Sequence, residues 1–139
     1  MRNKFLMIAV FFVMLFSVGC SAEKGVEFTD LVQDEVASIR MRHPGSGVLY
    51  ATTDADLINQ FVSAMKSEDY YKGSPQGVVG PTNIDLYNAD DKKIADIVFE
   101  GKGAVRINDE SYRLKSDVNE TELQPFFKEL MTEQNIVQE

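Results

Sequence analysis

The chain is poor in cysteine, histidine and positive charge. Its single cysteine, Cys20, excludes an intrachain disulfide framework and any multi-cysteine metal site. Its single histidine, His43, is the only imidazole that a Ser–His–carboxylate site could use. Fourteen basic residues stand against 22 acidic ones. Because nucleic-acid affinity rests on cationic side chains that displace counterions, this balance argues against a nucleic-acid partner.

Only one long apolar run is present, Phe5–Phe16, and it follows the basic residues Arg2 and Lys4. Its twelve residues fall short of the roughly 20 that a membrane-spanning helix needs. A short apolar run between basic and small residues is typical of an export signal. The positive charges before the run predict that the rest of the chain lies outside the cytoplasm.

The end of this signal, Ser17-Val18-Gly19-Cys20, resembles the lipobox of bacterial lipoproteins. The resemblance covers residues 1–20, with Ser17 at the position where leucine is usual. It implies cleavage between Gly19 and Cys20 by a lipoprotein signal peptidase, and a diacylglyceryl group on the Cys20 thiol. A second acyl chain is what makes such an anchor stable, because one chain binds membranes only marginally. An ordinary secretory signal with a chance cysteine, or an uncleaved signal anchor, are the alternatives.

The predicted organisation is therefore a signal peptide over 1–19, a lipidated Cys20 with a short tether over 20–29, and one domain over 30–139. Loss of residues 1–19 removes Arg2 and Lys4 and leaves 120 residues of formal charge −10. A domain of this size can bury an ordinary hydrophobic core without disulfides or bound metals. The tether residues 21–29 reach at most ~30 Å when extended, so the domain is expected close to the membrane.

The first half of the domain shows two periodicities. Alternating apolar residues predict a strand over 36–42, and after the turn residues 43–47 a short partner strand over 48–52. Apolar residues at three- and four-residue spacing then predict an amphipathic helix over 53–67, with Thr53 able to cap its first turn. Residues 68–81 hold three glycines and two prolines and predict a loop.

The second half predicts four strands, over 84–87, 94–100, 105–107 and 112–114, joined as an antiparallel meander. A second amphipathic helix follows, with a capping box from Thr121 to Gln124 and a start within a few residues of Pro125. The order strand, helix, four-strand meander, helix defines an α+β class. Both amphipathic helices are expected to pack on one face of the antiparallel sheet.

Three short motifs of the meander are also similar to those of small Gram-positive lipoproteins of unknown function. The motifs are Ile-x-Leu-Tyr from Ile84, Asp-Lys-Lys-Ile from Asp91, and Val-x-Ile-Asn-Asp-x-x-Tyr-x-Leu from Val105. The similarity extends over roughly residues 36–131. It implies a fold and a location, and it carries no chemistry.

Serine catalysis would have to combine His43 with Ser46 or Ser74 as the nucleophile. Neither serine lies in a Gly-x-Ser-x-Gly elbow. We therefore expect His43 to be a surface histidine in a turn, with a hydrolase as the alternative.

Four aspartates, Asp85, Asp90, Asp91 and Asp96, could gather calcium ligands, but their spacing does not match an EF-hand loop. We interpret Asp90 and Asp91 as residues of a solvated hairpin turn. The segment Gly101-Lys102-Gly103 does not match a phosphate-binding loop, because its glycines join two predicted strands.

Tyr70 and Tyr71 lie in the predicted loop and are the candidate ligand-binding residues, since aromatic side chains on loops often form recognition surfaces. The alternative is that both pack over a sheet edge with their hydroxyls in water. Arg40, Arg42 and His43 form a small basic spot that could face anionic lipid headgroups, although exposed cations on a strand need no function.

These patterns predict a membrane-anchored extracytoplasmic lipoprotein whose domain is a non-enzymatic binding module for an envelope protein or a small ligand. No catalytic residue, metal or cofactor is assigned to it. An envelope hydrolase or modifying enzyme that uses His43 is the alternative. A third possibility is a domain that inhibits or shields a neighbouring envelope protein.

Overall fold

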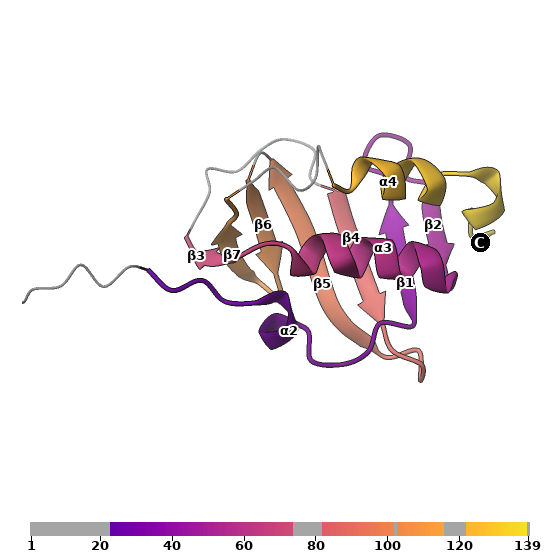
Figure 1. Cartoon of the computed structure of the whole chain (residues 1–139). Coiled ribbons are helices and arrows are strands. Elements are labelled where there is room, and N and C mark those ends of the chain that lie inside the picture. The colour runs from indigo at the N-terminus through magenta and orange to yellow at the C-terminus, as the bar shows by residue number, and fades with distance from the viewer. Residues whose placement is uncertain (1–22, 74–81, 102, 116–121, 139) are drawn as a thin grey trace, which may run out of the picture.

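A computed structural model of the chain describes residues 23–73, 82–101, 103–115 and 122–138. Within these residues, seven strands form one antiparallel sheet, which confirms the predicted α+β class (Figure 1). The strands are β1 (Ser38–Arg42), β2 (Leu49–Thr52), β3 (Tyr71–Lys72), β4 (Thr82–Tyr87), β5 (Lys93–Gly101), β6 (Ala104–Ile107) and β7 (Glu110–Arg113). The helices are α2 (Phe28–Leu31), α3 (Ala55–Lys66), α4 (Gln124–Leu130) and the 3-10 turn η1 (Glu133–Asn135).

The strands are ordered β2-β1-β4-β5-β6-β7-β3 across the sheet. The predicted meander is confirmed, because β4, β5, β6 and β7 are neighbours in chain order. Their hairpin turns follow local chemistry: Asn108 and Asp109, both at positive φ, form the two-residue turn between β6 and β7. β1 joins this meander from outside by pairing with β4.

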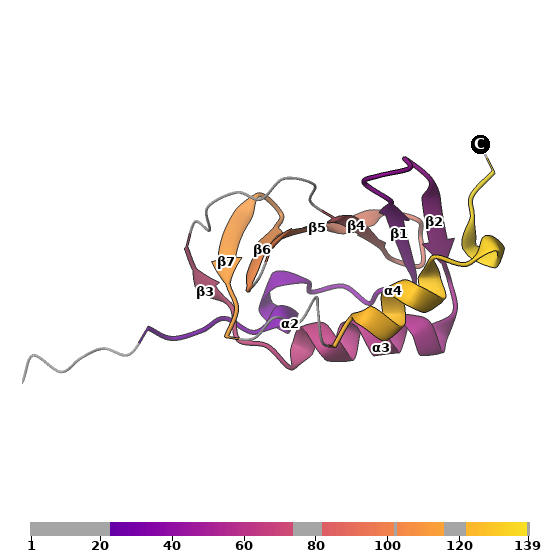
Figure 2. The same cartoon turned by 90° about the horizontal axis from the view of Figure 1, so that it is seen from above.

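The three helices lie on one side of the sheet, as Figure 2 shows most clearly. Strand residues of alternating positions point toward them and are buried, among them Ile39, Ile84, Ile97 and Ile107. α3 and α4 meet through the Phe61 and Phe126 rings, whose centroids lie 5.0 Å apart. The predicted packing of both amphipathic helices on one sheet face is thus confirmed, and the core lies between the two layers.

The N-cap of α3 is Asp54 and not Thr53 as the sequence suggested. The Asp54 carboxylate accepts a hydrogen bond from Leu57 N at 2.9 Å, which satisfies one of the unpaired amides of the first turn. Thr53 is exposed. The physical reason for the difference is backbone conformation, since Asp54 is still extended and the helix begins at Ala55.

The start of α4 differs in a similar way. Its N-cap is Leu123, which makes no side-chain capping bond, so Gln124 is the first helical residue rather than the far end of a capping box. Thr121 lies outside the described residues. Pro125 stands in the first turn, as its missing amide hydrogen requires.

The domain begins earlier than residue 30. Val26, which was expected in the tether, pairs with Tyr70 through backbone hydrogen bonds of 2.8 and 3.0 Å. Phe28 is only 2% exposed and packs its ring 6.1 Å from that of Tyr70. The tether therefore ends before Val26. The sequence does not predict this, because a single buried aromatic residue in a polar stretch shows no periodicity.

Both edges of the sheet are covered by short segments. At one edge β3, within the predicted loop 68–81, pairs with β7 through Tyr71 and Lys72. At the other edge the C-terminal segment lies along β2, where Val137 N donates to Leu49 O at 2.9 Å. Residues 74–81 of the predicted loop lie outside the described residues. Covering an edge in this way blocks its free backbone groups from pairing with another chain.

Candidate functional site

Tyr70 is a core residue and not a ligand-binding one. Its side chain is 0% exposed, and its hydroxyl donates to Met65 O at 2.7 Å. The ring also meets Tyr112 edge to face, with centroids 6.0 Å apart. Burial raises the pKa of the Tyr70 hydroxyl. Both expectations for this residue, ligand contact and a wet hydroxyl, are wrong, because the bridge to Val26 turns its side chain inward.

Tyr71 remains at the surface. It is half-buried on β3 at the sheet edge, and Lys115 Nζ lies 5.5 Å from its ring centroid. Lys115 also donates to Asp69 Oδ2 at 3.1 Å. Hydrogen bonds with Tyr71 and Asp69 raise the pKa of Lys115. This matches the edge-packing alternative for Tyr71.

The structure brings His43 and Ser46 together in the turn between β1 and β2. Ser46 Oγ lies 3.2 Å from His43 Nδ1. The same nitrogen accepts backbone hydrogen bonds from Gly45 N at 3.2 Å and Ser46 N at 3.1 Å. Its lone pair therefore organises the turn, as expected for a turn histidine. Ser74, the other nominated nucleophile, lies outside the described residues.

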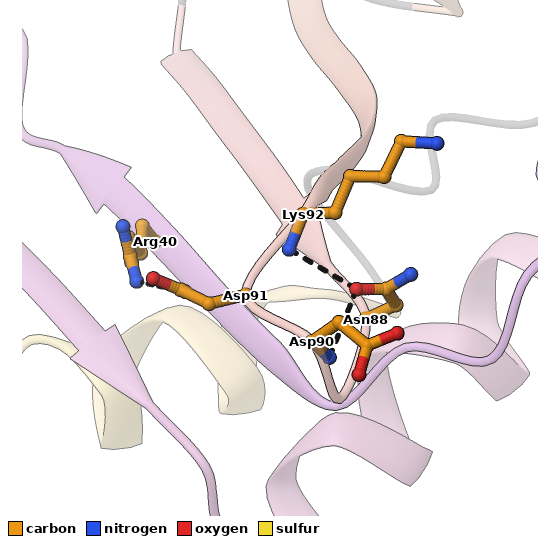
Figure 3. Close-up of polar contacts among 5 residues, drawn as sticks. All are labelled: Arg40, Asn88, Asp90, Asp91 and Lys92. Atoms are coloured by element: carbon orange, nitrogen blue, oxygen red, sulfur yellow. Dashed lines mark hydrogen bonds and ion pairs between the residues drawn. The ribbon is translucent and has the colours of Figure 1, made fainter.

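Asp90 and Asp91 lie in the turn between β4 and β5, as the sequence predicts (Figure 3). Asn88 Oδ1 accepts hydrogen bonds from Asp90 N and Lys92 N, each at 3.1 Å, and so closes the turn. Asp91, at φ 56°, directs its carboxylate to Arg40 on β1. A backbone turn and an ion pair thus account for these residues.

The other two aspartates lie opposite each other on β4 and β5. Asp85 and Asp96 are register partners, and Lys93 Nζ contacts them at 2.6 and 3.2 Å. The hydrogen bond to Asp85 is the largest effect that raises the pKa of Lys93. In the described part of the chain, no group of three metal-ligating side chains comes together. Gly101 and Gly103 flank the connection between β5 and β6, as predicted, and Lys102 is outside the described residues.

A cleft with a volume of about 400 Å³ lies between α3 and the segment that follows α2. Its lining includes the apolar residues Phe28, Val32 and Val62 and the charged residues Asp34 and Lys66. A smaller cleft of about 200 Å³ lies beside His43 and Phe127. Both are open to solvent.

The strongest collection of functional side chains lies on the sheet face opposite the helices. All four arginines beyond residue 22 occupy outward positions there: Arg40, Arg42, Arg106 and Arg113. Strand alternation places them so, because the residues between and beside them are in the core. In Figure 2 no described helix lies over this side of the sheet, which we call the open face, although two of its outward residues, Val98 and Ala104, are only 3% and 6% exposed.

Two rows of side chains cross the open face. The first contains Arg40, Asp85 and Asp96 in direct register. Here the charges are locally compensated: Arg40 pairs with Asp91, and its guanidinium carbon lies 4.0 Å from the Tyr87 ring centroid. Arg40 therefore does not contribute an unpaired charge to the basic spot that the sequence suggested.

The second row contains no carboxylate. Register partners place the following five residues side by side across the sheet, and we call them the arginine row: Arg42, Asn83, Val98, Arg106 and Ser111. Arg42 donates to Gly47 O at 2.7 Å at one end of this row. Sequence reasoning missed Arg106, although its place between the apolar residues Val105 and Ile107 does mark it as outward-facing.

Arg106 is the least satisfied polar side chain of the open face. Its Nε is the only buried side-chain nitrogen or oxygen in the described residues that lacks a hydrogen-bond partner. The nearest carboxylate oxygen, Glu100 Oε1, is 3.6 Å away. At that distance the pair has electrostatic attraction but no hydrogen bond.

Comparisons with protein-family models, with curated proteins and with solved structures return no match to this chain. None of the helices in the described ranges is long and apolar enough to span a bilayer. The class that the fold and the site define is an α+β protein with one sheet face covered by the described helices and a second face that carries four arginines.

Proposed function

We propose that the protein is a lipid-anchored, extracytoplasmic binding module whose recognition surface is the open face. Support for the anchor is the lipobox resemblance of Ser17–Cys20. Support for the recognition surface is the clustering of all four arginines beyond residue 22 on one face of a chain that is otherwise acidic. That clustering is the single observation on which the proposal rests.

The start of the domain limits how far it can lie from the membrane. Val26 is fixed to Tyr70 at the β3 side of the sheet. Val26 follows Cys20 by six positions, which is at most ~20 Å of extended chain. The β3 side of the sheet is therefore the side nearer the lipid, whereas β1, β2 and the C-terminus lie at the far end (Figure 1).

The anchor is tested by intact-mass analysis of the protein from its native membrane. We expect the chain to start at Cys20 and to carry acyl chains, and a Cys20→Ser variant to be released from the membrane fraction. A chain that keeps residues 1–19, or a Cys20 thiol without lipid, would contradict the anchor.

The recognition surface is tested by photocrosslinking in intact cells. A photoreactive residue replaces Asn83 on the open face, and a matched control replaces Lys128, which is exposed on α4 on the helix side. We expect one defined crosslinked product at position 83 and none at position 128. Products of equal yield at both positions, or at position 128 alone, would contradict the proposal.

The hydrolase alternative is supported by the 3.2 Å contact between Ser46 Oγ and His43 Nδ1. It requires that His43→Ala and Ser46→Ala abolish the same activity while the protein stays folded. A binding module instead keeps its crosslink at position 83 in both variants. The two proposals therefore give opposite results on the same pair of proteins.

A further inference from the structure

The cleft of about 400 Å³ beside α3 has two walls that run in opposite directions. One wall is α3, and the other is α2 with residues 32–36. At one end Phe28 packs against Tyr70, whose hydroxyl holds the last turn of α3. At the other end the second wall leads into β1, where Ile39 is the register partner of Thr52, just before α3 begins. Figure 1 and Figure 2 both show this segment running alongside α3.

The charges of the cleft are separated along its length. Lys66, in the last turn of α3, lines the end next to Phe28. Asp34 and Glu35 line it toward the opposite end, because they come just before β1. On the helix wall, Ile58 and Lys66 are eight positions apart, which is about 12 Å at ~1.5 Å per residue. The cleft therefore has a cationic end and an anionic end.

The polar groups of the cleft have no partner among the described residues. Six exposed polar side chains line it without a hydrogen bond or an ion pair to any described residue: Thr29, Gln33, Asp34, Glu35, Asn59 and Lys66. The backbone of residues 33–36 likewise makes no hydrogen bond within the described part of the chain. A ligand therefore gains these contacts without breaking existing ones.

The lining between the charged ends is apolar. Val32 and Val62 lie near the middle of the two walls, and Val36 lies closer to the carboxylates. Val36 and Val62 are only half-buried, so part of their apolar surface is in contact with water. A ligand with an apolar middle that covers this surface gains hydrophobic free energy.

We propose that this cleft binds a short apolar peptide with free termini. Lys66 holds the terminal carboxylate, and Asp34 and Glu35 hold the terminal ammonium group. An extended tetrapeptide is about 13 Å long at ~3.3–3.4 Å per residue, which matches the length of the helix wall. Its peptide groups suit the side-chain amides of Gln33 and Asn59 and the unpaired backbone of residues 33–36.

This site goes beyond the proposed function. The cleft lies on the helix side of the sheet, whereas the open face lies on the other side. The Asn83 crosslink tests only the open face, so each proposal can fail without the other.

The test uses the full chain in phosphatidylcholine nanodiscs and measures binding by isothermal titration calorimetry, with empty nanodiscs as the blank. The probe is the tetrapeptide Ala-Val-Val-Ala with free termini. Three matched peptides carry an acetylated N-terminus, an amidated C-terminus, or both. Each matched peptide removes one terminal charge or both and leaves the apolar side chains unchanged.

We expect the free tetrapeptide to bind in a saturable manner with a Kd below about 1 mM. Blocking either terminus should weaken binding about two- to fivefold, as for the loss of an exposed ion pair. Lys66→Gln should weaken binding of the free peptide by a similar factor and leave the amidated peptide unchanged, because that peptide already lacks the carboxylate. Asp34→Asn combined with Glu35→Gln should weaken binding of the free peptide and leave the acetylated peptide unchanged.

Two control variants remove the same charges outside the cleft. Lys128→Gln acts on α4, and Asp56→Asn acts in the first turn of α3; both side chains are exposed. Each should change the affinity less than about 1.5-fold, because distant exposed charges are screened by salt. Thermal unfolding of every variant separates a folding defect from a lost contact.

Three results would overturn the peptide proposal. They are no saturable heat at millimolar peptide, equal affinity for the free peptide and the peptide blocked at both ends, and equal effects of Lys66→Gln on the free and the amidated peptides. Control variants that weaken binding as much as the cleft variants would also overturn it, because the effect would then come from the total charge of the domain.

Discussion

The Tyr70 hydroxyl donates a hydrogen bond of 2.7 Å to the backbone carbonyl of Met65, and both side chains are completely buried. Met65 lies in the last turn of α3, where carbonyl groups have no partner within the helix. The bond therefore joins the end of the long helix to the point where the N-terminal segment enters the domain.

Loss of this bond should destabilise the domain. Tyr70→Phe keeps the ring but removes the donor at 2.7 Å from the Met65 carbonyl, which retains the longer hydrogen bond from Glu68 N at 3.4 Å. We expect the free energy of unfolding to fall by about 0.5–1.5 kcal/mol. Urea denaturation measures the change. Tyr71→Phe on the exposed edge is the matched control, with an expected change within ~0.5 kcal/mol. An equal effect of the two substitutions would contradict the buried position of Tyr70.

The same residue predicts a loss of stability at alkaline pH. Burial raises the pKa of Tyr70 in the folded state, whereas in the unfolded chain it titrates near pH 10. Above that pH the unfolded state has lost a proton that the folded state keeps. The free energy of unfolding should then fall by up to ~1.4 kcal/mol per pH unit.

This contribution is fully present below pH ~10 and is lost as the pH rises toward the folded-state pKa. Urea titrations between pH 8 and pH 11.5 measure it, and the difference between wild type and Tyr70→Phe isolates Tyr70 from the other titrating groups. Parallel curves for the two proteins above pH ~10 would show that the hydroxyl ionises in the folded state.

The start of α3 gives a second stability prediction. Asp54→Ala removes the carboxylate that accepts from Leu57 N, and we expect a loss of about 0.5–2 kcal/mol. Thr53→Ala changes an exposed neighbour and should be nearly neutral. Thermal unfolding of the two single variants compares them directly. A larger loss of stability for Thr53→Ala than for Asp54→Ala would contradict the assignment of the N-cap to Asp54.

The early start of the domain predicts that Phe28 is needed for stability. Phe28→Ala should cost about 3–5 kcal/mol, as for other large core aromatics. A chain that begins at residue 30 should lose at least as much, because the pairing between Val26 and Tyr70 is also missing. Calorimetry of both against the Cys20→Ser full-length protein is the measurement. If the chain that begins at residue 30 were as stable as the full-length protein, the tether would extend to residue 29, as the sequence predicts.

The ion pair between Arg40 and Asp91 is expected to contribute little. Both side chains are substantially exposed, at 36% and 70%, and such pairs are typically worth less than ~1 kcal/mol. Asp91→Asn removes the charge but tolerates the positive φ of this position. Unfolding in low and high salt measures the effect, which should vanish at high salt. A salt-independent loss would indicate a role in the turn of Figure 3 rather than in the ion pair.

Most of the fold could be predicted because its signals are local. The meander follows from alternation and from turn residues such as Asn108 and Asp109, whose preference for positive φ depends on neighbours in sequence. α3 follows from five buried residues on one helical face. α2 and β3 were missed because four and two residues are too few to show a period.

The candidate site was predicted less well. The glycine- and proline-rich neighbourhood of Tyr70 predicts a surface residue, whereas a backbone bridge to Val26, 44 positions away, turns it into the core. The sequence nominated Ser46 and Ser74 equally as partners of His43, and Ser46 lies beside His43 because the two are only three positions apart within one turn. Arg106 carried no signal beyond its outward position on a strand.

The amino-acid sequence by itself determined which side of each strand is apolar, where the helices and hairpins lie, and that a lipobox-like segment precedes the domain. Only the tertiary structure decided that β1 pairs with β4, although two strands and a helix lie between them in the chain, and so aligned Arg42 with Asn83, Val98 and Arg106. The physical reason is that alternation needs only adjacent residues, whereas strand order is selected by the burial of side chains distant in sequence against a common helical layer.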